Sequence, residues 1–136
     1  MKLKLFPIIF IALILLVLLP GFKCVKEDIE DKKLSGCIKG KLLVKGPCAQ
    51  FVIQVLEGDV KNASIAANWL DPETNTNYTN VFTVTNYCYF PGANVGDEFY
   101  FYFIRQVKTM ECIVCHAARA TPLQGNEIKY NGSVCP

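Results

Sequence analysis

The sequence is poor in histidine, and this scarcity limits the catalytic chemistry that it can support. It contains one histidine, one tryptophan and two methionines among 136 residues. A serine or cysteine nucleophile is usually activated by an adjacent base, and His116 is the only histidine that could serve. The twelve acidic residues are scattered along the chain and suggest no catalytic pair. We therefore expect no catalytic residues and a protein that is not an enzyme.

The chain also lacks a strong charge of one sign. Without the first 23 residues, which contain Lys2, Lys4 and Lys23, 11 basic residues remain against 12 acidic residues, a net charge of −1. Proteins that bind nucleic acids concentrate Lys and Arg to release counterions from phosphates, so we expect no nucleic-acid partner. The apolar fraction of 51% is too high for a disordered chain.

The one long hydrophobic run lies at the N-terminus. Residues 5–22 contain no charged side chain and follow two lysines. As a helix, this run would span roughly 27 Å. The pattern predicts that residues 1–23 are a signal peptide or a membrane anchor, and Pro20-Gly21 favours cleavage. We expect an exported protein that is secreted, periplasmic or displayed on the cell surface.

Cys24 follows the hydrophobic run directly, where bacterial lipoproteins carry their lipid anchor. Phe22 and Lys23 stand at positions that prefer small residues in that pathway, whereas residues 24–28 resemble the acidic export signal of surface lipoproteins of Bacteroidota. Lipidation of Cys24 is therefore an alternative to simple cleavage. In either case the membrane is contacted only through the N-terminal segment or a lipid on Cys24. Residues 24–35 are mostly polar and charged, and we interpret them as a charged tether.

From residue 36 onward, short runs rich in Val, Ile, Phe, Tyr and Thr alternate with Gly, Pro, Asn and Asp, which indicates an all-β domain over residues 36–136. Residues 63–70 are either a strand or a short helix, and residues 71–80 are expected to be a polar loop. The fold that we favour is a small OB-like Greek-key β-barrel, with Gly40 at a bend of its first strand. An immunoglobulin-like β-sandwich is the alternative. The expected strands are residues 38–44, 51–56, 81–90, 98–107 and 127–131.

Two of these strands carry alternating aromatic residues. In residues 81–90 and 98–107 the alternation places phenylalanines on one face and tyrosines on the other, and residues 91–97 could connect the two as an antiparallel pair. Aromatic faces stack on sugar rings or on protein side chains. The hypothesis is that the tyrosines bind a surface ligand, a carbohydrate or a protein. The alternative is that they pack across strands or lie under the tether or the Trp69 segment. The four tyrosines are Tyr87, Tyr89, Tyr100 and Tyr102.

Three short patterns carry a family resemblance: Gly-Cys-Ile-Lys-Gly at residues 36–40, Cys48 leading into Phe-Val-Ile-Gln-Val-Leu at residues 51–56, and Asn-Val-Phe at residues 80–82 followed by Cys88 and Phe90-Pro91. With these patterns, the chain resembles small secreted or surface-lipoprotein-like proteins of Bacteroidota that carry no assigned activity. The resemblance implies no catalytic residues.

Six cysteines in the folded part form an even set, which in an oxidising compartment predicts three disulfides. Fifteen connectivities are open. We expect Cys88, on the inward face of its strand, to form a buried bridge. The six are Cys37, Cys48, Cys88, Cys112, Cys115 and Cys135.

Cys112-Ile-Val-Cys115-His116 matches the attachment motif of c-type haem, in which two thiols bind the vinyl groups and the histidine binds iron. A second axial ligand is hard to find, because Met110, the only methionine outside the export segment, lies very near His116. A zinc site at these residues lacks a convincing fourth ligand. We therefore expect structural disulfides, no metal site and no cofactor. The alternative is a mono-haem electron carrier that uses Cys112, Cys115 and His116.

Overall fold

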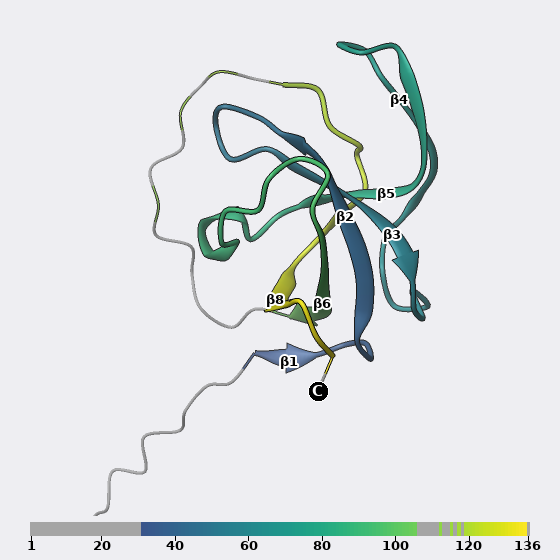
Figure 1. The fold of residues 1–136 in the computed structure, drawn as a ribbon, viewed down its shortest axis with the longest axis vertical. Helices are drawn as coiled ribbons and strands as arrows, with labels where there is room; N and C mark the ends of the chain where they lie inside the picture. Colours follow the sequence, from purple (N-terminus) through teal and green to yellow (C-terminus); the bar gives the residue numbers. More distant parts are fainter. Residues whose placement is uncertain (1–30, 106–111, 113–114, 116, 118, 136) are drawn as a thin grey trace, which may run out of the picture.

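The computed structural model describes residues 31–105, 112, 115, 117 and 119–135, and its chain path is shown in Figure 1. Nearly all of the described secondary structure is β-strand, so the predicted all-β, disulfide-stapled fold is confirmed. Within these residues no helix is long and apolar enough to cross a membrane. The elements are β1 (Lys32–Lys33), β2 (Ile38–Lys45), β3 (Phe51–Glu57), β4 (Ala66–Asp71), β5 (Thr76–Val84), the 3₁₀ helix η1 (Tyr87–Tyr89), β6 (Glu98–Arg105), β7 (Gly125–Asn126) and β8 (Ile128–Gly132).

The strands form one sheet in the order β1-β6-β2-β3-β5-β4. Off this path, β7 forms a parallel pair with β5, and β8 forms an antiparallel pair with β6. Because β7 and β8 are separated by a single residue, they link β5 to β6. Strand pairing, together with the chain connection from β7 to β8, therefore forms a cycle from β2 through β3, β5, β7, β8 and β6 back to β2.

The main core lies on one face of these strands and is rich in phenylalanine. In β2 every second residue is buried, as expected for a strand with one face toward a core. The ring centroids of Phe82 and Phe103 lie 5.3 Å apart, and those of Phe51 and Phe90 lie 4.8 Å apart. Each fully buried phenylalanine contributes about 1.5–3 kcal/mol to stability. The buried members are Ile38, Leu42, Phe51, Ile53, Phe82, Val84, Phe90, Ala93, Phe99, Phe101, Phe103 and Ile128.

The expected antiparallel pair of residues 81–90 with residues 98–107 is wrong. Strand β5 ends at Val84, and both β2 and β3 lie between β5 and β6 in the sheet. The phenylalanines of the two strands still meet, since the centroids of Phe82 and Phe101 lie 5.8 Å apart across the core.

The buried side chain of Asn86 explains why the strand ends early. Its amide nitrogen donates to the carbonyl oxygen of Ile128 at 2.8 Å, and its amide oxygen accepts from the N–H of Ile128 at 2.9 Å. The side chain thus makes the two bonds that a neighbouring strand would make. After Asn86 the backbone turns into η1.

Strands β4 and β5 form a hairpin that extends beyond the rest of the sheet (Figure 1). Of the two alternatives expected for residues 63–70, the structure has a strand, β4, which begins at Ala66. The polar loop expected at residues 71–80 is wrong, because β5 begins at Thr76. The outer part of this hairpin is mostly exposed on both faces, so its polar sequence shows no apolar alternation. At its base a second apolar cluster forms from Val44, Val52, Ala66 and Val81, with Leu43, Trp69 and Tyr78 packed against it.

The last residues of the segment 24–35, which was expected to be a tether, pair with the sheet. Lys32 and Lys33 pair with Arg105 and Ile104 of β6. The N–H of Leu34 donates to the carbonyl of Phe103 at 2.8 Å. The folded part therefore begins before residue 36, whereas residues 24–30 lie outside the described residues.

The three predicted disulfides are present, and their pairing is now defined. They join Cys37 to Cys135, Cys48 to Cys115 and Cys88 to Cys112. The prediction for Cys88 was wrong in detail, because this residue is half-buried in η1 and not on the inward face of a strand. Three intramolecular disulfides are expected of a chain that folds in an oxidising compartment.

Candidate functional site

The two tyrosines of β6 lie on the face opposite the phenylalanines, as the alternation predicts, but Tyr102 is covered. Its side chain is 7% exposed, and the ammonium group of Lys33 lies 4.2 Å from its ring centroid. Tyr100 is half-buried. Tyr102 thus lies under the N-terminal segment, which was the alternative to a binding role.

The other two tyrosines belong to a different part of the fold. Tyr87 and Tyr89 lie in η1. Tyr87 packs against the main core, and the side chain of Tyr89 is 51% exposed. The predicted grouping depended on a strand that continues past Val84. Because the chain leaves the sheet there, the four rings do not form one exposed aromatic face.

Both cysteines of the haem-like motif are in disulfides. Cys112 is bonded to Cys88 in η1, and Cys115 is bonded to Cys48 in the loop between β2 and β3. Thioether bonds to haem would require both disulfides to be reduced first. His116, Met110 and the lipidation candidate Cys24 lie outside the described residues. Among the residues that are described, no group of three or more His, Cys, Asp or Glu could hold a metal ion.

Two hollows lined by described residues do not provide a clear binding site. One, about 340 Å³ in volume, lies between residues 33–36 and residues 59–62. Its polar groups already bind one another: Lys61 pairs with Asp59 at 3.3 Å, and the amide of Asn62 donates to the carbonyl of Leu34 at 3.1 Å. A second hollow of about 210 Å³ lies beside the end of β3.

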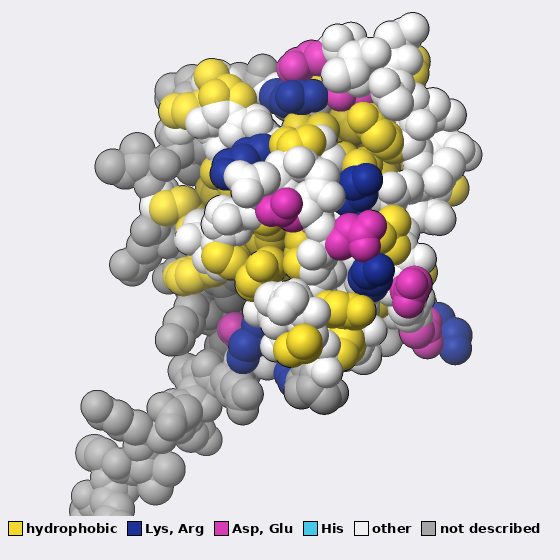
Figure 2. All heavy atoms as spheres, viewed as in Figure 1, with side chains coloured by type: hydrophobic (Ala, Val, Ile, Leu, Met, Phe, Trp, Pro, Cys, Tyr) yellow, Lys and Arg dark blue, Asp and Glu magenta, His cyan; other side chains and the backbone are white. Residues whose placement is uncertain are grey.

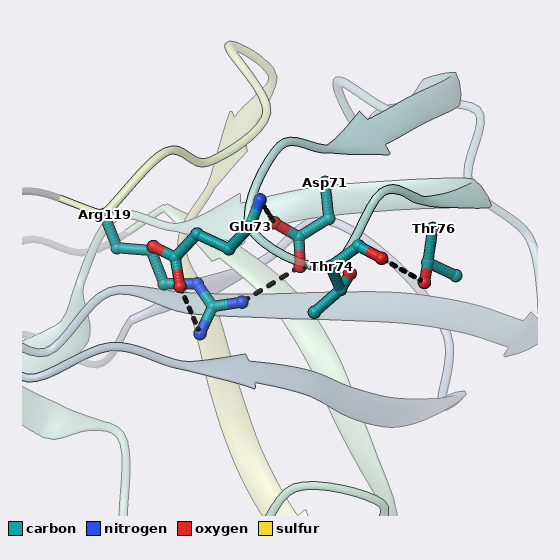
Figure 3. Close-up of polar contacts among 5 residues, drawn as sticks. All are labelled: Asp71, Glu73, Thr74, Thr76 and Arg119. Carbon is teal, nitrogen blue, oxygen red and sulfur yellow. Dashed lines mark hydrogen bonds and ion pairs between the residues drawn. The ribbon is translucent and has the colours of Figure 1, made fainter.

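A connected polar cluster lies at the turn of the β4–β5 hairpin (Figure 3). Asp71, the last residue of β4, is 1% exposed. Its carboxylate accepts hydrogen bonds from the N–H of Glu73 at 3.1 Å, the hydroxyl of Thr74 at 3.0 Å and the guanidinium of Arg119 at 2.9 Å. Arg119 also pairs with Glu73 at 3.4 Å. We call these four residues the hairpin clamp.

Burial alone would raise the pKa of Asp71. The hydrogen bonds from Glu73 and Thr74 and the charge of Arg119 outweigh burial and hold this pKa below its ordinary value. Asp71 is therefore a carboxylate at neutral pH and is not suited to act as a proton donor there. The hairpin clamp fixes structure.

Arg119 belongs to a segment that is fastened across the sheet. The side chain of Gln50 donates to the carbonyl of Ala117 at 2.9 Å, and the hydroxyl of Thr83 donates to the carbonyl of Pro122 at 2.7 Å. Through Arg119, this segment also holds the turn of the hairpin. No local sequence pattern predicts the contact between Arg119 and Asp71, because their sequence separation is 48.

The outer edge of β4 is a strand edge whose backbone groups can be located from the pairing of its other edge with β5. The carbonyl of Thr79 accepts from the side chain of Gln54 at 3.0 Å, so it points toward β3 and away from β4. Asn68 is the residue opposite Thr79. In an antiparallel pair the backbone groups of opposite residues point either toward each other or apart. The N–H and C=O of Asn68, and by the two-residue period those of Leu70, therefore point to the outer edge.

Nothing in the described part of the chain pairs with this edge. The strand contains neither proline nor lysine, and its only charged residue, Asp71, is buried in the hairpin clamp. Leu70 is 55% exposed. Proline, lysine and other charged residues commonly protect natural edge strands, and an edge without exposed residues of these kinds can accept another strand. In the view of Figure 2, the projecting end of the molecule is likewise mostly uncharged.

Comparison with known proteins adds no relative: no family model matches the chain, and no curated protein or solved structure is significantly similar to it.

Proposed function

We propose that this protein is an exported, non-enzymatic binding or structural module of the cell surface, built as an OB-like Greek-key barrel. The three disulfides support export, because such bonds persist in oxidising compartments. The cyclic order of strand pairing supports the barrel, since closure of this kind removes sheet edges.

The open edge of β4 carries the proposal for binding. The outward backbone groups of Asn68 and Leu70 are arranged to pair with an extended polypeptide, the mode of recognition known as strand addition. The hairpin clamp holds the end of this strand in place before any partner arrives, which lowers the cost of ordering it on binding.

A phage-displayed library of linear dodecapeptides tests the binding site. We expect peptides selected on the wild-type protein to bind Asn68→Pro at least 10-fold more weakly, because proline removes the outward N–H. Leu123→Ala is the matched control, since Leu123 is 98% exposed and belongs to no strand. Leu70→Lys is a second edge variant in case Asn68→Pro fails to fold. Peptides that bind all variants equally well would refute the proposed site.

A visible absorption spectrum separates this proposal from the haem alternative. We expect the purified exported protein to be colourless, with none of its six paired cysteines reacting with a thiol reagent under denaturing conditions. A sharp Soret band together with loss of the bonds at Cys112 and Cys115 would support the electron carrier.

A further inference from the structure

We propose that the partner of the β4 edge is a second copy of this chain. The β4 strands of the two copies would pair antiparallel across a twofold axis at Trp69. The inference rests on the proposed function, since it needs the edge to accept a strand. It goes further in naming the occupant and the register.

The spacing of the outward residues is symmetric. Asn68 and Leu70 flank Trp69, so a twofold axis at Trp69 places Asn68 of each copy opposite Leu70 of the other. Residues that point toward each other across an antiparallel pair exchange two hydrogen bonds. Both pairs together give four backbone hydrogen bonds, which use the outward groups of both residues on each copy.

The side chains are compatible with this register. Trp69 stands opposite Trp69 of the second copy, at a position where the backbone groups point away and side chains approach closely. Within each copy Trp69 already stacks on Tyr78, with centroids 6.1 Å apart and ring planes 22° apart. The dimer would therefore bring together four aromatic rings on one face of the joined hairpins, an arrangement that stabilises sheets.

Charge offers no resistance to the pairing. Residues 66–70 are uncharged, and Asp71 is neutralised by Arg119 within its own copy. The exposed side chain of Leu70 would become partly covered. Because the hairpin extends beyond the rest of the sheet, the two main cores need not approach each other (Figure 1).

Association should be weak, because a single short strand buries less surface than a typical stable interface. Sedimentation equilibrium of the Cys24→Ser protein, which lacks the cysteine outside the three described disulfides, should show a monomer–dimer equilibrium with a Kd of about 10 μM to 1 mM. A protein that stays monomeric at about 1 mM overturns the dimer. If the same protein still binds selected peptides through β4, the proposed binding site survives and only the choice of partner is wrong.

Two double variants test the register. Asn68→Lys with Leu70→Lys places two lysines opposite each other in the dimer and should weaken association at least 10-fold, because like charges directly opposite are destabilising. Asn68→Lys with Leu70→Glu changes the same two exposed positions but places opposite charges together, and it should restore association to within about 3-fold of wild type. Equal behaviour of the two variants would overturn the twofold register. Circular dichroism establishes that both remain folded.

Discussion

Asp71 holds a negative charge at a buried position, and three hydrogen-bond donors make this charge tolerable. Breaking a buried pair by removing one partner leaves the remaining charge uncompensated, which is costly. The remaining donors, Thr74 and the N–H of Glu73, would offset part of that cost.

We expect Arg119→Met to lower the free energy of unfolding by about 1–3 kcal/mol at pH 7. Urea denaturation measures the change. Glu73→Gln is the control, because the side chain of Glu73 is 52% exposed and its pair with Arg119 contributes little. A loss in Glu73→Gln equal to that in Arg119→Met would contradict a dominant role for the buried carboxylate.

The same carboxylate predicts a pH dependence. The pKa of Asp71 is lower in the folded protein than its ordinary value of 3.8. Its ionised form therefore stabilises the fold above that ordinary value, and this contribution disappears as the pH falls through the lower, folded value. The difference between wild type and Arg119→Met should shrink below about pH 4. A difference that stays constant down to acid unfolding would rule out Asp71 as its source.

Among single residues, the sequence predicted those with local patterns. The even set of cysteines predicted three disulfides, but spacing alone could not choose among fifteen pairings. Arg119, Asp71 and the amide of Asn86 were not predicted, because each acts through a partner more than 40 residues away.

Among the elements, β2 shows how a strand bends around the core. Its pairing with β3 shifts register between Lys39 and Gly40, the position where the sequence predicted a bend. A Cβ at Gly40 would lie 2.7 Å from a ring carbon of Phe101, 2.9 Å from a methyl carbon of Ile53 and 3.1 Å from the carbonyl oxygen of Gln54. The glycine thus allows two core side chains to pass close to the strand.

We expect Gly40→Ala to lower the free energy of unfolding by about 1–3 kcal/mol, because the core must shift to admit the methyl group. Gly36→Ala is the matched control, since a Cβ there meets nothing within 4 Å. Chemical denaturation of both variants gives the comparison. If Gly40→Ala is as stable as Gly36→Ala, the close approach of Phe101 and Ile53 is not important for stability.

The elements that the sequence predicted well are those with one face in the main core. Strands β2, β3, β6 and β8 were predicted within a few residues, because each is a short run rich in apolar or aromatic residues that is bounded by turn residues. The β4–β5 hairpin projects from the core, so its composition resembled a loop. The predicted end of β5 was wrong because Tyr87, Cys88 and Tyr89 continue the aromatic pattern beyond the strand.

On the scale of the whole molecule, the disulfides join distant parts of the chain. The bond between Cys37 and Cys135 ties the start of β2 to the residues after β8, and its two cysteines have a sequence separation of 98. Such a bond stabilises the fold mainly by restricting the unfolded chain.

We expect the double variant Cys37→Ala with Cys135→Ala to lose about 2–4 kcal/mol of stability. Its thermal midpoint should fall by roughly 10–20 °C, measured by circular dichroism. Cys24→Ser is the control, because none of the three bonds uses Cys24. An unchanged midpoint in the double variant would show that restricting the unfolded chain through this bond adds nothing to stability.

The order of the three bonds has a consequence for biogenesis. They are nested, with Cys88–Cys112 inside Cys48–Cys115 and both inside Cys37–Cys135. If the chain is exported with its N-terminus leading, Cys37 and Cys48 enter the oxidising compartment before the other four bonded cysteines. They have no native partner there until Cys115 and Cys135 arrive. A cell that makes this protein must therefore keep these two thiols apart or reopen a premature bond between them by thiol–disulfide exchange.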